Sequence, residues 1–332
     1  MTGIVIVGVA HSHVEYALAE LRERPDLRLD GVHDPDQEAA AGIAAEFGAP
    51  VLSSLDEVLR LRSSIVVCAG VYSERADIVL AALRGGADVL CDKPLCLDLD
   101  ELAAIEATAA STGRRVALML EKRTYPETLA LTEAIEEGRL GVPVALASWA
   151  PHKLLREQRA PWFLDPDNYG GILADLLVHD VDIALQITGA TRGTVRGWLG
   201  PTIETGFHLQ GGATVVLDDG DGDGVRLSAE VDWLTPSGSD IHGDYRLRVV
   251  GAEGTAEVYW GRGVFELTTA SEPRHSPRAP RGRRPAQDAL DALLAGGADA
   301  DRATRDAIVA TRIALLAERS ARMGGVELNW EA

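Results

Sequence analysis

Lysine is rare in this sequence, and each lysine stands where a chemically active side chain would be expected. Lys93, Lys122 and Lys153 are the only lysines among 32 basic residues. An ammonium group can shift its pKa, donate a proton and act as a compact point charge, whereas a guanidinium stays charged and forked. Lys93 is the middle residue of the tripeptide Asp92-Lys93-Pro94, which directly follows the apolar run 87–91. This run predicts a buried strand, and open α/β sheets bind their ligands at the carboxyl ends of such strands.

A second group of reactive residue types lies in the pattern Gly-Gly-x-x-x-Asp-x-x-x-His at residues 170–179. Asp175 and His179 are four residues apart in a predicted helix, so they share a face and can point into one cleft. Imidazole titrates near neutrality and suits proton transfer, and a carboxylate one turn away can orient it. Two alternatives stay open. One is a metal site that adds His152, although no further His or Cys has ligand spacing; the other is a plain polar helix edge.

The turn Gly8 to His13, between a predicted strand and a predicted helix, is typical of dinucleotide binding in its position. Of the three usual glycines only Gly8 is present, Ala10 is small enough for a pyrophosphate to approach, and His13 fills the last position. Asp34 ends the second predicted strand, where an acid can bind a ribose diol, and residues 35–38 offer no base to a 2′-phosphate. This pattern favours NAD over NADP. The alternative is a tight turn at Gly8 and a helix cap at Asp34. The predicted cofactor-binding residues are Gly8, Ala10, His11, Ser12, Asp34, Asp92, Lys93 and Pro94.

Composition and charge narrow the class of protein. The chain has 332 residues, so we expect two domains. Its formal net charge of −19 opposes binding to nucleic acid and to anionic membranes. Three cysteines are too few for a disulfide framework or a four-cysteine zinc site, and they are typical of core residues in a reducing compartment. The N-terminal segment has no signal-peptide pattern and no stretch has the length of a membrane span, so we expect a cytoplasmic protein.

Short apolar runs alternate with helical patterns up to residue 120, and longer alternating strands follow. The first pattern predicts a parallel sheet covered on both faces, and the second predicts one large, mostly antiparallel sheet with helices on one face. We therefore predict a Rossmann-type, doubly wound α/β domain at residues 1–122 and an α+β domain with an open sheet at residues 123–332. The predicted strands are 4–9, 27–33, 65–69, 87–91, 115–120, 144–150, 195–199, 214–217, 225–233, 245–250 and 255–260, and the predicted helices are 14–24, 37–47, 75–84, 99–111, 171–188 and 302–322.

Two of these motifs together resemble those of a known family. The tripeptide Asp-Lys-Pro at residues 92–94 resembles the Glu-Lys-Pro motif of the glucose–fructose oxidoreductase and inositol dehydrogenase family (Gfo/Idh/MocA), and the Gly-Gly-x-x-x-Asp-x-x-x-His pattern resembles its second-domain signature. The similarity spans nearly the whole chain. It implies a Rossmann domain followed by an α/β domain, active-site roles for Lys93, Asp175 and His179, and homodimers or homotetramers joined through the large sheet. The chain departs from the family pattern in the aspartate of the tripeptide, in the missing glycines of the first turn, and in Arg75, where a His is usual.

The expected reaction is hydride transfer between a nicotinamide and a hydroxyl or keto carbon of a sugar, cyclitol or related polyhydroxy compound. One group must take the proton of the alcohol, and another must stabilise the developing alkoxide. We expect His179 to act as the base, Asp175 to orient it and Lys93 to stabilise the alkoxide, with Lys93 as the base in the alternative. Two other functions stay open, an NAD-dependent glycosidase that uses transient oxidation and a non-catalytic ligand sensor of the same fold.

Cationic and aromatic side chains after predicted strands are the expected substrate contacts. Cations bind carboxylates and an indole can stack on a sugar face, which suits a polyhydroxy or acidic ligand. The alternative for Lys122 and Lys153 is that both are surface charges. The predicted substrate-binding residues are Lys122, Arg123, His152, Lys153 and Trp162.

Two further segments are assigned to turns and loops. The sequence from Asp219 to Gly224, with Glu230, matches a calcium-loop pattern, but its predicted flanks are strands and not the helices of an EF-hand. We therefore expect a hairpin turn there and predict no metal cofactor. The Arg- and Pro-rich stretch 271–285 is expected to be a mobile surface loop, with a lid or a partner contact as the alternative.

Overall fold

The structure is a computed structural model that describes residues 1–203, 206–220 and 224–332. The chain divides into two compact units. The first comprises Met1–Glu121, Ala160–Gly170 and Arg284–Ile308, and the second comprises Lys122–Arg159, Gly171–Arg283 and Val309–Ala332. The first break, after Glu121, is one residue before the end of the predicted first domain, whereas the two later segments of the first unit have no counterpart in the prediction.

The first unit contains a five-stranded parallel sheet in the order β2-β1-β3-β4-β5. Val51 adds a parallel bridge to Val32 beyond β2, and this extra position gives the strand order of a Rossmann fold. The strands are almost continuously apolar, as in the Ile-Val-Val-Cys sequence of β3, because helices cover both faces. The predicted doubly wound parallel sheet is confirmed. Its strands are β1 (Thr2–Val7), β2 (Leu27–His33), β3 (Ile65–Cys68), β4 (Asp88–Asp92) and β5 (Val116–Met119).

Helices join these strands, and capping residues set several of their boundaries. Asp36 and Asp98 accept the first amide hydrogens of α2 and α5, and Gly48 and Gly113 end the same helices in the left-handed conformation. The helices of this unit are α1 (Val14–Glu23), α2 (Gln37–Phe47), α3 (Leu55–Leu61), α4 (Arg75–Arg84), α5 (Leu99–Thr112) and α9 (Gln287–Ala295).

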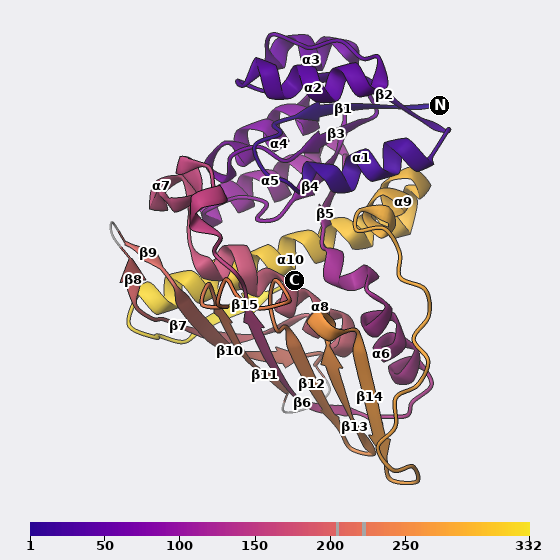
Figure 1. Cartoon of the computed structure of the whole chain (residues 1–332), viewed down its shortest axis with the longest axis vertical. Coiled ribbons are helices and arrows are strands. Elements are labelled where there is room, and N and C mark those ends of the chain that lie inside the picture. Colours follow the sequence, from indigo (N-terminus) through magenta and orange to yellow (C-terminus); the bar gives the residue numbers. More distant parts are fainter. Residues whose placement is uncertain (204–205, 221–223) are drawn as a thin grey trace. The chain divides into compact units, whose positions relative to one another are not determined.

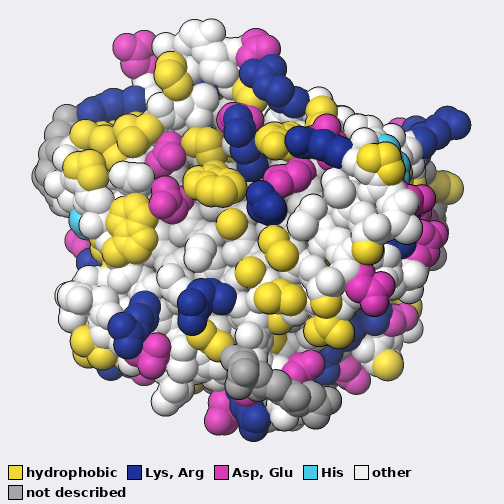
Figure 2. All heavy atoms as spheres, turned by 90° about the horizontal axis from the view of Figure 1, so that it is seen from below, with side chains coloured by type: hydrophobic (Ala, Val, Ile, Leu, Met, Phe, Trp, Pro, Cys, Tyr) yellow, Lys and Arg dark blue, Asp and Glu magenta, His cyan; other side chains and the backbone are white. Residues whose placement is uncertain are grey.

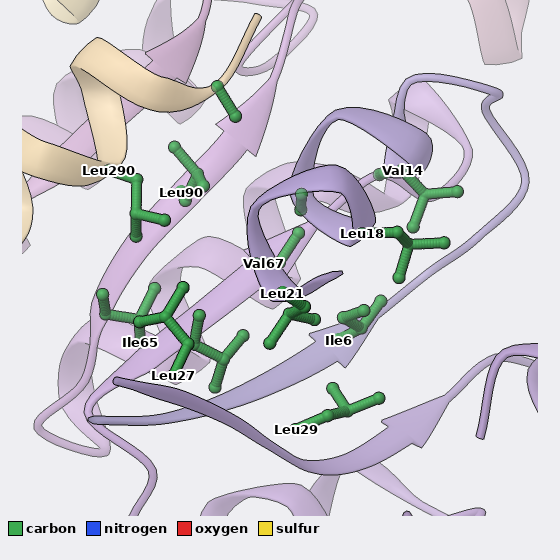
Figure 3. Packing of buried hydrophobic residues seen from close by; sticks show 14 of the residues in the cluster. Ile6, Val14, Leu18, Leu21, Leu27, Leu29, Ile65, Val67, Leu90 and Leu290 are labelled. Atoms are coloured by element: carbon green, nitrogen blue, oxygen red, sulfur yellow. The ribbon is translucent and has the colours of Figure 1, made fainter. Parts of the chain in front are cut away.

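Apolar side chains from helices and strands form the core of the first unit. In Figure 3, Leu21 of α1 lies among Ile6 and Val67 of the sheet, and Leu290 of α9 lies beside Leu90 of β4. A helix from the C-terminal part of the chain therefore completes the core of the N-terminal sheet.

The second unit contains an eight-stranded open sheet in the order β14-β13-β12-β6-β11-β10-β7-β15. Neighbouring strands are antiparallel except for β6 and β11, which are parallel. The predicted large, mostly antiparallel open sheet is confirmed, and the strands predicted from sequence do not include β14 or β15. The strands are β6 (Pro143–Pro151), β7 (Arg192–Leu199), β10 (Gln210–Asp218), β11 (Val225–Asp232), β12 (Arg246–Gly251), β13 (Gly254–Tyr259), β14 (Val264–Thr269) and β15 (Leu328–Glu331). A separate two-stranded sheet pairs β8 (Thr202–Ile203) with β9 (Phe207–His208).

Helices cover one face of the large sheet. Figure 1 shows α6 (Pro126–Glu136), α8 (Val178–Thr188) and the later part of α10 (Gly297–Arg322) along this face. The alternation in β11 explains this layer, because Leu227, Ala229 and Val231 are buried while the residues between them are exposed. A π-helical turn, Leu173–Leu177, precedes α8. Shorter elements are α7 (Pro166–Tyr169) and 3-10 turns at Tyr72–Glu74, Glu121–Thr124, Arg156–Gln158, Pro161–Leu164 and Trp260–Arg262.

The Arg- and Pro-rich stretch is anchored to the second unit near both its ends. Leu267 of β14 forms an antiparallel bridge with His275, and the backbone N–H of Arg283 donates to the Thr124 carbonyl at 2.9 Å. The sequence analysis expected a mobile surface loop and did not predict these two backbone contacts.

The calcium-like motif lies between two strands, as predicted. β10 and β11 are antiparallel and pair Leu217 with Val225, while Asp221 to Asp223 lie outside the described residues. In the part of the chain that the structure describes, no helix combines the length and the apolar character needed to cross a membrane.

Candidate active site

Asp92 ends β4 and is the centre of a buried polar network. Its Oδ2 accepts a hydrogen bond from Arg75 at 2.8 Å and lies 2.9 Å from Nδ1 of His11. Its Oδ1 lies 2.8 Å from Nδ1 of His13. Asp92 and Arg75 are both 0% exposed. One carboxylate with three nitrogen partners therefore stands directly before Lys93.

The pKa values in this network follow from burial and from these contacts. Burial by itself would raise the pKa of the Asp92 carboxyl, but His13, Arg75 and His11 outweigh it and hold this pKa well below its ordinary value. Burial lowers the pKa of His11 to about 4, against the attraction of Asp92. His11 is therefore neutral near pH 7, and a hydrogen on its Nδ1 completes the bond to Asp92.

His11, His13 and Asp92 also have the residue types of a metal site, because one donor atom of each lies within 4.8 Å of the others. Both carboxylate oxygens, however, already contact imidazole nitrogens, and the Arg75 guanidinium binds Oδ2 as well. A metal ion would have to break these bonds and sit beside a fixed positive charge. The arrangement fits a hydrogen-bond network better than a set of metal ligands.

The turn after β1 passes very close to the end of β3. Gly8 has a φ of 81°, and a Cβ there would lie 2.5 Å from the backbone nitrogen of Gly70, so a side chain does not fit. The N–H of His11 donates to the carbonyl of Ala69 at 2.9 Å, and α1 begins at Val14. A turn pressed against the sheet edge and followed at once by a helix N-terminus fits the pyrophosphate of a dinucleotide.

Asp34 follows β2 and ties two turns together. Its carboxylate oxygens accept the backbone N–H groups of Val9 at 2.6 Å and of Asp36 at 2.7 Å. Asp36, and not Asp34, caps α2. Each oxygen of Asp34 still has a lone pair, so both can accept a further hydrogen bond.

Lys93 lies beside a cluster of aromatic rings. It is 4% exposed, and its Nζ lies 5.8 Å from the centroid of the fully buried Tyr72 ring. The same ring contacts the Arg75 guanidinium at 4.3 Å and the ring of Trp162 at 5.0 Å. Trp162, a predicted substrate contact, thus belongs to the first unit and packs on the ring next to Lys93. An ammonium beside aromatic faces suits a polyhydroxy ligand.

In the second unit, Asp175 lies in the π-helical turn and His179 lies in the first turn of α8. Both side chains are buried, with 0% and 2% of their surface exposed. A regular helix was expected over 171–188. Because a π turn is only slightly wider than an α turn, residues four apart still lie on one side of it. Gly171 permits the turn to pass Glu318, since a Cβ on Gly171 would lie 2.6 Å from a carboxylate oxygen of Glu318.

Lys122 and Arg123, two predicted substrate contacts, are paired with acids of α8. Lys122 Nζ donates to Asp180 at 2.9 Å, and both residues are almost fully buried. The Arg123 guanidinium binds Asp182 through two nitrogens. Burial raises the pKa of Asp180, against the attraction of Lys122. These ion pairs attach the first turn of α8 to the segment before α6.

His152 and Lys153 lie in the loop after β6. Nδ1 of His152 contacts the Ala150 carbonyl at 2.9 Å, and its ring lies 4.4 Å from the Tyr245 ring. Lys153 Nζ donates to the Ser239 carbonyl at 2.6 Å. The ammonium of Lys122 lies 5.3 Å from the Tyr245 ring, so Tyr245 contacts both Lys122 and His152.

The Trp260 ring lies 4.9 Å from Lys122 Nζ. The sequence analysis misses four residues that shape these sites, Tyr72, Asp180, Tyr245 and Trp260. Tyr72 follows a predicted strand just as Lys93 does, so its position could have identified it. A buried lysine needs an acidic partner, and that rule could have pointed to Asp180. Tyr245 and Trp260 have no signal beyond an aromatic residue at a predicted strand end.

Two family models match most of the chain. A model described as an oxidoreductase family with an NAD-binding Rossmann fold matches residues 2–120, and the model of the GFO/IDH/MocA C-terminal domain matches residues 128–257.

Individual relatives are similar over much of the chain. An inositol 2-dehydrogenase from Rhizobium meliloti (strain 1021) is 26% identical over 72% of this chain and 67% of its own length. The scyllo-inositol 2-dehydrogenase (NAD(+)) of Bacillus subtilis (strain 168) is 28% identical over 70% of this chain and 66% of its own length. The matched segments thus span about two thirds of these relatives.

A solved structure shows the same fold from end to end. Levoglucosan dehydrogenase in complex with NADH and levoglucosan superposes with a TM-score of 0.83 at 16% identity, over 99% of this chain and 98% of that one. The chain therefore belongs to the GFO/IDH/MocA oxidoreductase family, with the family's NAD-binding Rossmann fold at residues 2–120 and its C-terminal domain at residues 128–257.

Proposed function

We propose that this protein interconverts a hydroxyl and a keto group on a sugar, cyclitol or related polyhydroxy compound by hydride transfer with NAD. The observation that carries the proposal is Lys93, a buried ammonium at the carboxyl end of β4 in the unit that has the NAD-binding fold. The relatives named inositol dehydrogenases support the substrate class. NAD, when bound, supplies the hydride acceptor or donor.

The residues have distinct roles in this proposal. Lys93 stabilises the negative charge that develops on the substrate oxygen, as a compact ammonium in a buried site does well. His179 takes the proton from the hydroxyl group, and Asp175 orients its imidazole. Lys93 is the alternative proton acceptor, because a buried lysine can act as a base.

The proposed cofactor residues are those predicted from sequence. The turn at Gly8, Ala10, His11 and Ser12 would hold the pyrophosphate next to the N-terminus of α1. Asp34 would accept hydrogen bonds from the adenosine ribose, which favours NAD over NADP. The tripeptide Asp92, Lys93 and Pro94 would face the nicotinamide end.

The proposed substrate contacts fall into two kinds. Trp162 and His152 offer ring faces to a polyhydroxy ligand. Lys153 offers a cation, while Lys122 and Arg123 are engaged by Asp180 and Asp182 and would act on the substrate chiefly through the placement of α8.

We also propose that copies of the chain associate through the outer face of the large sheet. Four residues on neighbouring strands are paired in a row across this face, in the order Trp198, Gly212, Glu230 and Trp149. The Trp198 indole lies over Gly212. Trp149 and Trp198 are 46% and 40% exposed. In Figure 2, hydrophobic side chains lie among charged ones of both signs on the face shown. Light scattering of the wild type and of Trp149→Asp would measure the association.

The function is tested with a panel of substrates. Wild type, Lys93→Met and His179→Ala are incubated with NAD or NADP and with myo-inositol, scyllo-inositol, glucose or levoglucosan, and NADH absorbance is recorded. We expect NADH from at least one compound, with both variants slower by orders of magnitude and with NAD affinity nearly unchanged. Asp175→Asn should lose less activity.

Other outcomes point to other functions. Release of an aryl group from an aryl glycoside without net NADH would indicate the glycosidase. Binding of a polyol without any turnover would indicate the sensor. Equal turnover by wild type and Lys93→Met would contradict the proposed role of Lys93.

A further inference from the structure

Arg75 is a buried cation in an unfavourable place. It is the first residue of α4 and is 0% exposed. The N-terminus of a helix carries partial positive charge, so a cation there is destabilising, and burial of a guanidinium adds a large desolvation cost. Such a residue persists when fixed acceptors compensate it.

Four acceptors surround the guanidinium of Arg75. Its Nε donates to the carbonyl of Gly70 at 3.1 Å, and one terminal nitrogen donates to the carbonyls of Asp92 at 3.0 Å and Pro94 at 2.9 Å. The other terminal nitrogen donates to the Asp92 carboxylate at 2.8 Å. The two backbone carbonyls belong to the residues before and after Lys93, so one nitrogen holds the chain on both sides of it.

Arg75 also contacts the ring beside the Lys93 ammonium. Its guanidinium lies 4.3 Å from the centroid of Tyr72, and Lys93 Nζ lies 5.8 Å from the same centroid. Arg75 therefore contacts both the backbone on either side of Lys93 and the aromatic ring beside the Lys93 ammonium.

We propose that Arg75 is a positioning residue that sets the location of the Lys93 ammonium in the reaction. This inference rests on the proposed function for its catalytic consequence. A lysine at position 75 would keep the charge, but it would have three donors at one point and could not reach acceptors spread over Gly70, Asp92 and Pro94.

The placement of Lys93 can be measured without substrate. Because the sequence has three lysines, protein labelled with ε-¹³C-lysine should give three ε-methylene signals, and Lys93→Met identifies that of Lys93. We expect Arg75→Gln to shift this signal, since the group lies near an aromatic ring, and to leave those of Lys122 and Lys153 unchanged. Arg75→Lys should also shift the Lys93 signal, and it replaces the Gln variant if that variant does not fold. The fourth signal, from the new lysine, is recognised by comparison with wild type.

A matched control is Arg284→Gln. Arg284 binds the fully buried Glu20 through two nitrogens in the same unit, at 2.6 and 2.8 Å, and has no contact with the Lys93 segment among the described hydrogen bonds. It should lower thermal stability without moving the Lys93 signal. An unmoved Lys93 signal in a folded Arg75 variant would overturn the proposal.

The catalytic effect of Arg75 is measured as turnover of the best substrate in the panel. Arg75→Lys should reduce kcat by roughly 10- to 100-fold, with little change in the KM for NAD, because a misplaced catalytic group costs rate more than binding. The double variant Arg75→Lys/Lys93→Met should be no slower than Lys93→Met, since Arg75 acts through Lys93. Independent, multiplying losses would refute the positioning role. Normal turnover by Lys93→Met would instead refute the proposed function and leave the spectroscopic result standing.

Discussion

The buried pair of Lys122 and Asp180 leads to a quantitative prediction for Lys122→Met. The ammonium and carboxylate lie 2.9 Å apart, with 3% and 1% of their side chains exposed. Methionine fills the space but leaves the carboxylate without its partner. Loss of one member of a buried ion pair costs about 3–5 kcal/mol. Burial already raises the pKa of Asp180, which shows that the charged form of this carboxyl is costly to keep in the interior.

The pH dependence of this loss has a definite sign. A carboxyl group with a raised folded-state pKa binds more protons in the folded state, so its contribution to stability falls as pH rises above 3.8, the value for the unfolded chain, and through the folded-state pKa. Removal of Lys122 raises the pKa of Asp180 further. The cost of Lys122→Met should therefore be largest near pH 7 and should shrink toward pH 4, where Asp180 becomes neutral.

Native-state hydrogen exchange of the α8 amides measures this effect locally. A loss of about 3–5 kcal/mol corresponds to exchange faster by roughly 150- to 5000-fold at pH 7. Arg192→Met is the control, because its pair with Asp218 is 56% and 23% exposed and solvent screens it, so its loss should change exchange little. A Lys122→Met loss below about 1 kcal/mol, or one that does not depend on pH, would refute the account of this pair as buried and charged.

Three further predictions concern the first turn, the ribose site and the π turn. His11→Gln should make the melting temperature less sensitive to acid. The neutral His11 contributes about 3 kcal/mol of stability, which is present above pH 6.5 and is lost as pH falls toward about 4. A melting temperature that is as acid-sensitive in the variant as in wild type would contradict the burial of His11. Asp34→Ala should weaken NAD far more than NADP in calorimetric titrations, and a wild type that prefers NADP would show that the assignment of Asp34 is wrong. Gly171→Ala should destabilise the protein by about 1–3 kcal/mol, because its Cβ would press on Glu318. In a Glu318→Ala background Gly171→Ala should cost less in thermal unfolding than it does in wild type, and an equal cost in both backgrounds would contradict the steric explanation.

The parallel sheet was predictable because its signals are local and repeated. Predicted helices at 37–47 and 75–84 agree with α2 and α4 at both ends, since Asp36 caps the first and Gly85 follows the second. The apolar run before it likewise predicted that Lys93 lies at the carboxyl end of a buried strand, and Lys93 directly follows β4. Periodicity and capping residues contain this information within about a dozen residues of chain.

Other features depend on contacts between distant residues, which no local pattern encodes. The parallel pairing of β6 with β11 joins strands that several elements separate. The engagement of Lys122 by Asp180 links positions 58 residues apart. The π turn at Leu173–Leu177 has no distinct residue signature, and the periodicity of its apolar residues reads as an ordinary helix.

The π turn also makes the second motif tolerant of a change in chain length. A π turn holds one residue more than the α-helical ladder needs, so deletion of a single residue within Leu173–Leu177 could close it into a regular helix without unfolding α8. Because the wide turn absorbs that residue, the segment before it should stay nearly in phase with His179 after the deletion. If the lost residue lies between Asp175 and His179, the two become residues three apart on a regular helix, and such residues still share a face. Homologues with one residue fewer between the glycines and the histidine are therefore expected to keep the relation between Asp175 and His179.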